Sequence, residues 1–222
     1  MIKIAFYNDN FTLECVNKNV LFPWPKPQDL DDAEHVAKYA ALTTFQLKKL
    51  GYSSNKLGKL VKKGVLYRYK VITAEVDSLP SIYTPGYTAQ VIARLPVPRF
   101  PDLDKLRKIL MMNQAIISIS SKTEANIDVN IMRPVQIITI NNPVAVLVAT
   151  DESYVELPLR YDLNQAIVIL TNKYLAKSGF PFRYILEEDL EFDNFDLQFY
   201  SYSEEKGLFP IEINFEKKNQ VS

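Results

Sequence analysis

The clearest amphipathic pattern in the chain begins at Ser53 or Ser54 and stops at Gly64. At about 100° per residue, three apolar side chains share one stripe of a helix, namely Leu57, Leu60 and Val61. The opposite side collects polar side chains, namely Asn55, Lys56, Lys59, Lys62 and Lys63. A serine suits the N-cap of a helix and a glycine the residue after its last turn. The pattern therefore predicts a short helix with one buried face and one cationic face.

Two further helices are predicted before this one. The segment "TTFQLKKLG" opens with Thr43 and Gln46 in the T-x-x-Q spacing of a capping box, and Gly51 supplies a left-handed stop. Upstream, "DLDDAEHVAKYAAL" begins at Asp29 with several acids, which are favourable at the positive end of a helix dipole. Three helices are therefore expected to follow one another between residues 29 and 64.

After Gly64 the pattern changes to a strand-like alternation. The segment "VLYRYKV" alternates side chains with a period of two, and "SIYTP" can pair with it across the loop "TAEVDSLP". The order of two helices, a cationic helix and a hairpin is that of a winged helix-turn-helix.

The second half of the chain mixes helical and strand-like patterns. The segment "DLDKLRKILMMNQAI" predicts a helix, and "LRYDLNQAIVILTNKYLAKSG" predicts another, with Gly179 just past its end. The remaining apolar runs read as strands, namely "IISISS", "VQIITI", "VAVLVAT", "FRYILEE", "LQFYSYS" and "FPIEINFE". Strands mixed with helices indicate a mixed α/β domain.

The predicted fold class is therefore α+β, with an N-terminal winged helix-turn-helix domain and a C-terminal mixed α/β domain. Proline-rich "PVPRFP" leaves no room for regular structure and places the boundary between them. Residues 1–28 contain two short extended runs around "NDN" and predict a β-ribbon or N-terminal arm. The expected divisions are 1–28 for this arm, 29–95 for the winged helix, 96–101 for the linker and 102–222 for the second domain.

Charge is distributed unevenly although the whole chain of 222 residues is neutral, with 26 basic and 26 acidic side chains. Residues 1–100 carry 14 Lys and Arg against 8 Asp and Glu, whereas residues 101–222 carry 12 against 18. No acid interrupts the chain between His35 and Ala74. A half rich in positive charge indicates a polyanionic partner.

Double-stranded DNA is the partner that this pattern predicts. Lysines neutralise phosphates and release counterions, while the first residues of a recognition helix reach base edges in the major groove. Asn55 suits adenine, and Lys56 or Lys59 suits guanine. The predicted DNA-binding residues are Lys48, Lys49, Ser53, Ser54, Asn55, Lys56, Lys59, Lys62, Lys63, Arg68 and Lys70. A winged helix that docks an acidic protein instead, as an interaction adaptor, is the alternative.

The N-terminal half resembles the replication-relaxation family of bacterial plasmids and mobile elements. The matching segments are "YAALTTFQLKKLGYSSNKLGKLVKKGVLYRYKV" and "SIYTPGYTAQVIAR". Members often return from the hairpin through a "YxLTxxG"-like stretch, and the residues in that place here are Tyr83, Thr84, Pro85 and Gly86. The resemblance implies a winged-helix protein associated with plasmid replication and DNA topology.

The C-terminal half is similar to the same family through "MRPVQIITINNPVAVLVATDE". It shares Arg133 and Pro134 of an "RPD" element, but Val135 stands where the acid is expected. Because the family's C-terminal region is similar to restriction-endonuclease-like folds, the resemblance implies a degenerate fold of that kind. A Mg²⁺-dependent nuclease is therefore the alternative function.

No catalytic template supports an enzyme. A nuclease of this kind needs an Asp and then an acid two residues before a Lys, whereas Asp151 and Glu152 have no Lys at that spacing and Glu216 directly precedes its lysines. Single residues Cys15 and His35 make neither a zinc site nor a nucleophile pair. The expectation is a protein without catalytic residues, metal or cofactor.

The remaining expectations concern partners and location. Winged-helix proteins gain contacts by binding two half-sites, so a homodimer is expected. Acidic "EEDLEFDNFD" repels DNA and predicts a protein partner for the second domain. Without a membrane span or a secretory segment, a cytoplasmic protein that does not enter membranes is expected. Its expected role is to regulate replication or transcription of a plasmid or mobile element.

Overall fold

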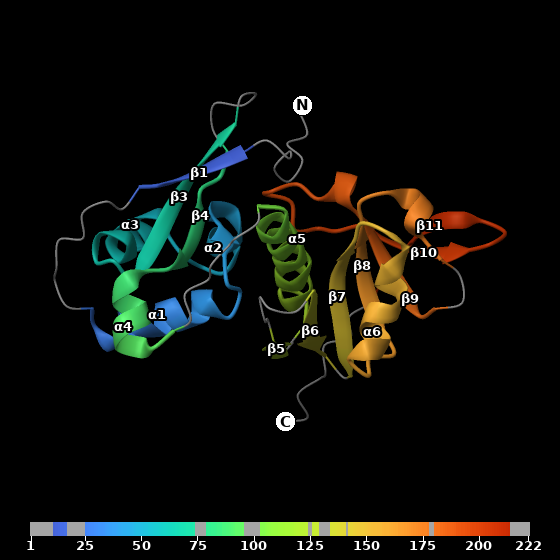
Figure 1. Cartoon of the computed structure of the whole chain (residues 1–222), viewed down its shortest axis with the longest axis horizontal. Coiled ribbons are helices and arrows are strands. Elements are labelled where there is room, and N and C mark those ends of the chain that lie inside the picture. The colour runs from blue at the N-terminus through green and yellow to red at the C-terminus, as the bar shows by residue number, and fades with distance from the viewer. Residues whose placement is uncertain are drawn as a thin grey trace. The chain divides into compact units, whose positions relative to one another are not determined.

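The chain is a mixed α+β protein with two sheets in a computed structural model (Figure 1). Its contacts group into two compact units, a first unit of Tyr7–Asn113 and a second unit of Met1–Phe6 with Gln114–Ser222. The predicted linker 96–101 lies outside the residues that the structure describes. Those residues are 11–16, 25–73, 79–95, 103–123, 126–128, 134–140, 142–177 and 180–213.

The first unit combines helices with a four-stranded antiparallel sheet in the order β1-β3-β4-β2. The predicted hairpin is confirmed by antiparallel pairing of β3 with β4, and most of its connecting loop (74–78) lies outside the described ranges. The elements are β1 (Phe11–Cys15), α1 (Pro27–Ala37), β2 (Leu42–Thr43), α2 (Thr44–Lys49), α3 (Ser54–Lys62), β3 (Leu66–Thr73), β4 (Ile82–Pro85) and α4 (Tyr87–Ala93).

The predicted helix boundaries around α2 and α3 are confirmed. Thr43 and Gln46 form the reciprocal capping box, with Gln46 N donating to Thr43 Oγ1 at 3.2 Å and Thr43 N donating to Gln46 Oε1 at 3.0 Å. Ser53 Oγ caps α3 by accepting from Lys56 N at 3.2 Å. Gly51 and Gly64 follow the two helices with φ of 89° and 66°, the left-handed conformation that glycine adopts without strain.

The first predicted helix is correct in type and wrong at its end. It begins at Pro27, where the prolyl ring fits the first turn, and Asp29 Oδ2 accepts from Lys26 N at 2.7 Å. It stops at Ala37 because Ala40 takes a positive φ of 62° and Leu42 pairs with Tyr83 of β4. The pairing of β2 therefore outweighs the helix propensity of the "YAAL" segment.

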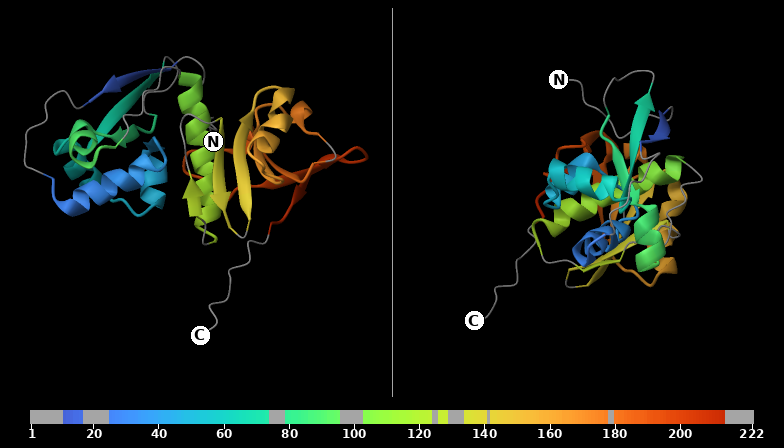
Figure 2. Two further views of the ribbon diagram at one scale, coloured as in Figure 1. Left: turned by 60° about the horizontal axis from the view of Figure 1, so that its bottom comes forward. Right: turned by 90° about the vertical axis from the view of Figure 1, so that its left-hand side faces the viewer.

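The second unit is built on a seven-stranded sheet in the order β11-β10-β9-β8-β7-β6-β5. Strands β7, β8 and β9 run parallel and the outer pairs are antiparallel. Figure 2 shows the β10–β11 hairpin in red at one end of this sheet. The elements are α5 (Leu103–Ser120, in this unit from Gln114 on), β5 (Asn126–Asp128), β6 (Val135–Thr139), β7 (Pro143–Ala149), η1 (Glu152–Val155), α6 (Glu156–Arg160), β8 (Ala166–Leu170), η2 (Lys173–Leu175), β9 (Phe182–Leu186), η3 (Glu187–Asp189), β10 (Phe199–Ser203) and β11 (Gly207–Ile211).

Two predictions in this half are wrong. The run "IISISS" is not a strand, because Ile116–Ser120 continue α5 and Ile116, Ile117 and Ile119 are buried. The long helix predicted through "LRYDLNQAIVILTNKYLAKSG" is replaced by the end of α6, by β8 and by η2, while Gly179 lies outside the described part. All five residues of β8 are buried, and a strand buried on both faces reads as a continuous apolar run without alternation.

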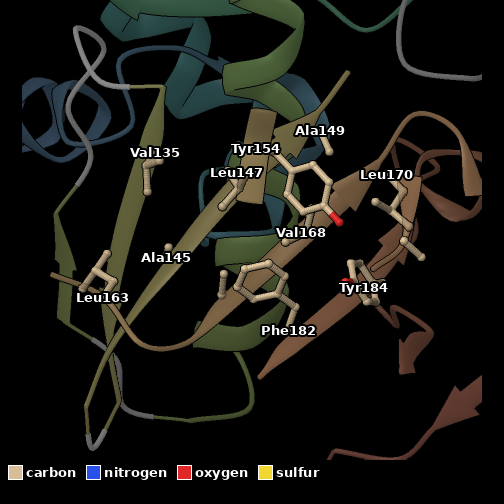
Figure 3. Close-up of a cluster of buried hydrophobic side chains, with 12 residues drawn as sticks. Val135, Ala145, Leu147, Ala149, Tyr154, Leu163, Val168, Leu170, Phe182 and Tyr184 are labelled. Carbon is tan, nitrogen blue, oxygen red and sulfur yellow. The ribbon is translucent and has the colours of Figure 1, made fainter. Parts of the chain in front are cut away.

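The strands predicted from "VQIITI", "VAVLVAT", "FRYILEE" and "LQFYSYS" are confirmed, and "FPIEINFE" overlaps β11. One face of this sheet carries a cluster of buried apolar side chains (Figure 3). Tyr154 of η1 lies over it, 6.0 Å from the Phe182 ring between centroids, and donates its hydroxyl to Leu175 O at 2.7 Å. Burial of this cluster fixes η1 and η2 against the sheet.

Candidate nucleic-acid interface

The exposed side of α3 carries four of the predicted DNA-binding residues, namely Ser54, Asn55, Lys59 and Lys62. Leu57 and Leu60 are buried against the rest of the first unit, as predicted. In Figure 1, α3 lies beside β3, and the two elements are in contact. The side chains on the outer face are exposed, namely those of Ser54, Asn55, Lys59 and Lys62, with Gly58 among them. This face is polar and cationic over the whole helix.

Two of the predicted DNA-binding lysines are engaged within the protein. Lys56 Nζ lies 2.6 Å from Asp32 Oδ1, and Lys63 Nζ lies 2.7 Å from Asp29 Oδ2. Both carboxylates belong to α1, so these lysines lie along the edge of α3 that meets α1. The sequence pattern groups these lysines with the other cations and does not predict their pairing with Asp32 and Asp29. The only sequence signal was the acidic start of α1.

The remaining predicted contacts lie on α2 and at the start of α3. Lys48 and Lys49 are exposed in the last turn of α2, and Lys48 Nζ stands 5.7 Å from the centroid of the Phe45 ring. Ser53 is exposed, but its hydroxyl is the N-cap acceptor of α3. Its first role is therefore to start the helix.

The two predicted basic residues of β3 share one face of the sheet. Arg68 and Lys70 are exposed, and they alternate with Tyr67 and Tyr69, whose rings meet edge to face at 6.4 Å between centroids. Arg68 Nε donates to Ser81 Oγ at 3.1 Å. Lys70 lies opposite Glu14 of β1 in the antiparallel register, so a carboxylate shares its face.

A polar network joins α1 to the start of α3 around Tyr52. The Tyr52 hydroxyl lies 3.0 Å from His35 Nδ1 and 3.4 Å from the carbonyl oxygen of Asp32. Lys56 Nζ lies 4.8 Å from the centroid of the Tyr52 ring. The network places the amine of Lys56 between an aromatic face and a carboxylate.

The single histidine of the chain is kept neutral by this environment. Burial lowers the pKa of His35 below its usual value of 6.5, and the positive charges of Lys38 and Lys56 lower it further, against an opposing effect of Asp32. Burial also raises the pKa of Tyr39 to about 12. Neither group therefore carries charge at neutral pH.

The acids considered for a nuclease have other partners. Asp151 caps η1, with its Oδ1 accepting from Ser153 N at 2.8 Å, and Glu152 Oε1 lies 3.0 Å from Lys177 Nζ. Glu216 lies outside the described residues. Within the described ranges, no three His, Cys, Asp or Glu side chains gather closely enough to hold a metal ion.

The acidic stretch "EEDLEFDNFD" also has internal contacts. Tyr200 donates its hydroxyl to Asp189 Oδ2 at 2.9 Å, and Lys122 Nζ lies 2.7 Å from Asp196 Oδ1. Within the same unit, Gln114 Nε2 donates to the carbonyl oxygens of Glu191 and Asn194 at 3.0 and 2.6 Å. The backbone of this stretch is thereby fastened to α5.

Comparison with known proteins does not add a family. No family model, no curated protein and no solved structure matches the chain. The resemblance to the replication-relaxation family therefore stays a prediction.

In the described part of the chain, no helix is both long enough and apolar enough to cross a membrane.

Proposed function

We propose that the first unit is a winged helix-turn-helix that binds double-stranded DNA with α3 as its recognition helix. The element order α1-β2-α2-α3-β3-β4 supports this, as does the pairing of β4 with both β2 and β3. In such modules the second helix of the helix-turn-helix enters the major groove and the hairpin contacts the backbone.

The observation that carries the proposal is the outer face of α3. It presents Asn55, Lys59 and Lys62 to solvent, and α3 itself contains no acid. Asn55 lies in the first turn, where a recognition helix reaches bases, and its amide can bond adenine in two places. Lys59 and Lys62 follow one and two turns later, which suits phosphates or a guanine edge.

The proposed role is regulation of replication or transcription of a plasmid or mobile element, in line with the resemblance. A homodimer would let two α3 helices occupy two half-sites about 34 Å apart. We further propose that the second unit is an assembly domain that meets a protein partner, and that the whole protein acts in the cytoplasm.

A degenerate restriction-endonuclease-like second unit is supported by its element order. Helix α5 is followed by the antiparallel strands β5, β6 and β7, then by α6 and by β8, which is parallel to β7. The strand β7 reads "PVAVLVA" and offers no carboxylate or lysine. The chemistry that positions Mg²⁺ and a water molecule therefore lacks its groups on this strand.

Charge reversal on α3 tests the DNA-binding proposal. The double variant Lys59→Glu/Lys62→Glu is compared with Lys173→Glu/Lys206→Glu, which makes the same change in net charge at exposed lysines of the second unit. Affinity for a duplex is measured by fluorescence anisotropy at several salt concentrations. We expect the α3 variant to lose at least about tenfold in affinity, with a salt slope shallower by about 0.9 per lost phosphate contact. The control variant should bind nearly as the unaltered protein does.

Equal binding by both variants would place the interface elsewhere. If the unaltered protein binds no duplex even at low salt, the first unit is a protein-docking module and the DNA proposal is wrong.

Incubation of supercoiled plasmid with Mg²⁺ or Mn²⁺ tests the nuclease alternative, because nicking that disappears in Asp151→Ala would establish it.

A further inference from the structure

We infer that Asp29 and Asp32 of α1 limit how many phosphates α3 can neutralise, and that they thereby lower the affinity for DNA of random sequence. The inference rests on the proposed DNA-binding function of α3. It concerns two carboxylates that compete with DNA for Lys63 and Lys56.

The geometry of the two pairs carries the inference. The carboxylates are mostly shielded from solvent, with side-chain exposures of 16% for Asp29 and 13% for Asp32. Their lysine partners are 21% and 42% exposed, so each lysine side chain is more exposed than the carboxylate with which it pairs. Partly buried pairs are screened by salt less than exposed ones and are correspondingly harder to separate.

Asp29 is held in its charged form by several contacts at once. Burial by itself would raise its pKa, but hydrogen bonds from Lys63 Nζ and Lys26 N, together with the charges of both lysines, leave the pKa below its usual value. The same oxygen, Oδ2, accepts from both donors at 2.7 Å. The carboxylate therefore stays ionised and available to Lys63 at any pH at which DNA binding would be measured.

Helix geometry places both pairs beside the proposed DNA face. Lys56 and Lys63 are seven residues apart, which returns to nearly the same direction after two turns. Relative to Asn55, they point roughly 80–100° around the helix, whereas Lys59 and Lys62 lie within about 40° of it. A phosphate at the rim of the α3 face would thus be within reach of Lys56 and Lys63 only if these lysines left their carboxylates.

The consequence for DNA binding follows from counterion release. Each additional phosphate that is neutralised steepens the salt dependence by about 0.9 and adds affinity that does not depend on sequence. Two lysines held by Asp29 and Asp32 do not contribute to this affinity, and their carboxylates repel the backbone. Binding then depends more on base contacts, which raises the ratio of specific to non-specific affinity.

The double variant Asp29→Asn/Asp32→Asn tests this directly in the full chain. Asparagine keeps an oxygen that can accept from Lys26 N, so the start of α1 is preserved. The matched control is Asp31→Asn/Glu34→Gln, which removes two charges from exposed positions of the same helix and leaves both pairs intact. Binding to a random-sequence duplex is measured from about 50 to 200 mM KCl, and folding is checked by circular dichroism and thermal unfolding.

We expect the double variant to bind random duplex about tenfold more tightly than the control at the low end of this range, with a slope steeper by about 1.8. If it fails to fold, Asp32→Asn alone should give about a threefold gain and half the change in slope. Equal affinity and slope in the pair variant and the control, or weaker binding by the pair variant, would overturn the inference. Absence of binding by the unaltered protein would instead count against the proposed function itself.

Discussion

Gly86 lies so close to Gly64 that a β-carbon at position 86 would stand 2.2 Å from the Gly64 carbonyl oxygen. Gly86 N also donates to Val65 O at 2.7 Å, and Thr88 uses its backbone N and its hydroxyl to bond Gly64 O and Lys63 O at 3.1 Å each. The start of α4 thereby satisfies carbonyl groups that the end of α3 leaves open. This contact fixes the end of the proposed recognition helix.

Substitution of Gly86 by alanine should therefore destabilise the protein strongly. The new methyl group would overlap backbone atoms that cannot move independently, at a cost of about 3 kcal/mol. Gly58→Ala is the matched control, because a β-carbon at this exposed position of α3 would meet nothing within 4 Å. Alanine is also the better helix former and should stabilise by about 0.5–1 kcal/mol. Urea unfolding of both variants gives the comparison, and equal stability would contradict the close packing at Gly86.

The stability of the protein should depend on His35 between neutral and mildly acidic pH. Because the pKa of His35 is lowered in the folded protein, the unfolded chain takes up a proton first as the pH falls below about 6.5. The free energy of unfolding should then decrease until the pH has passed the folded pKa.

His35→Gln keeps a hydrogen-bonding group near Tyr52 but cannot titrate. Urea unfolding at a series of pH values from about 8 to 5 should show a smaller loss of stability in the variant than in the unaltered protein. Carboxylates contribute equally to both proteins, and the chain contains one histidine, so the difference isolates this residue. Parallel curves would mean that His35 titrates alike in the folded and unfolded states.

Tyr154→Phe should destabilise the second unit by about 1–2 kcal/mol, because it leaves the Leu175 carbonyl without the Tyr154 hydroxyl that bonds it at 2.7 Å. Tyr174→Phe is the matched control, since it removes the same hydroxyl group from a side chain that is 80% exposed. Its stability should change by less than about 0.5 kcal/mol. Thermal unfolding distinguishes the two, and an equal effect would show that the hydroxyl of Tyr154 does not stabilise the fold.

Asn55→Ala should reduce sequence preference while leaving the salt slope unchanged. A neutral amide that reads a base loses about 1–3 kcal/mol of discrimination on removal, but it neutralises no phosphate. The preferred duplex is first selected from a random pool, and affinities for selected and scrambled duplexes are then compared at several salt concentrations. A uniform loss on both duplexes would make Asn55 a backbone contact.

Local signals in the sequence determined much of the first unit. The capping box at Thr43, the serine cap of α3 and the glycines at 51 and 64 each act within one turn, so they specify helix ends without tertiary contacts. The alternation in β3 and the two-sided pattern of α3 are equally local, because each has one buried and one exposed side.

Tertiary structure decided what periodicity does not encode. Ile116–Ser120 and Ala166–Leu170 are both rich in β-branched apolar residues, yet one is helix and the other strand. Because both segments are almost fully buried, the pattern of apolar and polar residues does not distinguish a strand from a helix in them. The strand conformation of Ala166–Leu170 is selected by pairing with its neighbours in the sheet. Long-range pairing likewise ended α1 at Ala37.

The same holds for the candidate site. The sequence determined that α3 and its C-cap Lys63 carry five polar or basic residues opposite the apolar stripe, because their spacing along a helix is fixed. It did not determine that Asp32 and Asp29 form ion pairs with Lys56 and Lys63, because the partners are 24 and 34 residues apart in the sequence. The fold of the first unit brought these charges within ion-pair distance, and it left Asn55, Lys59 and Lys62 facing the solvent.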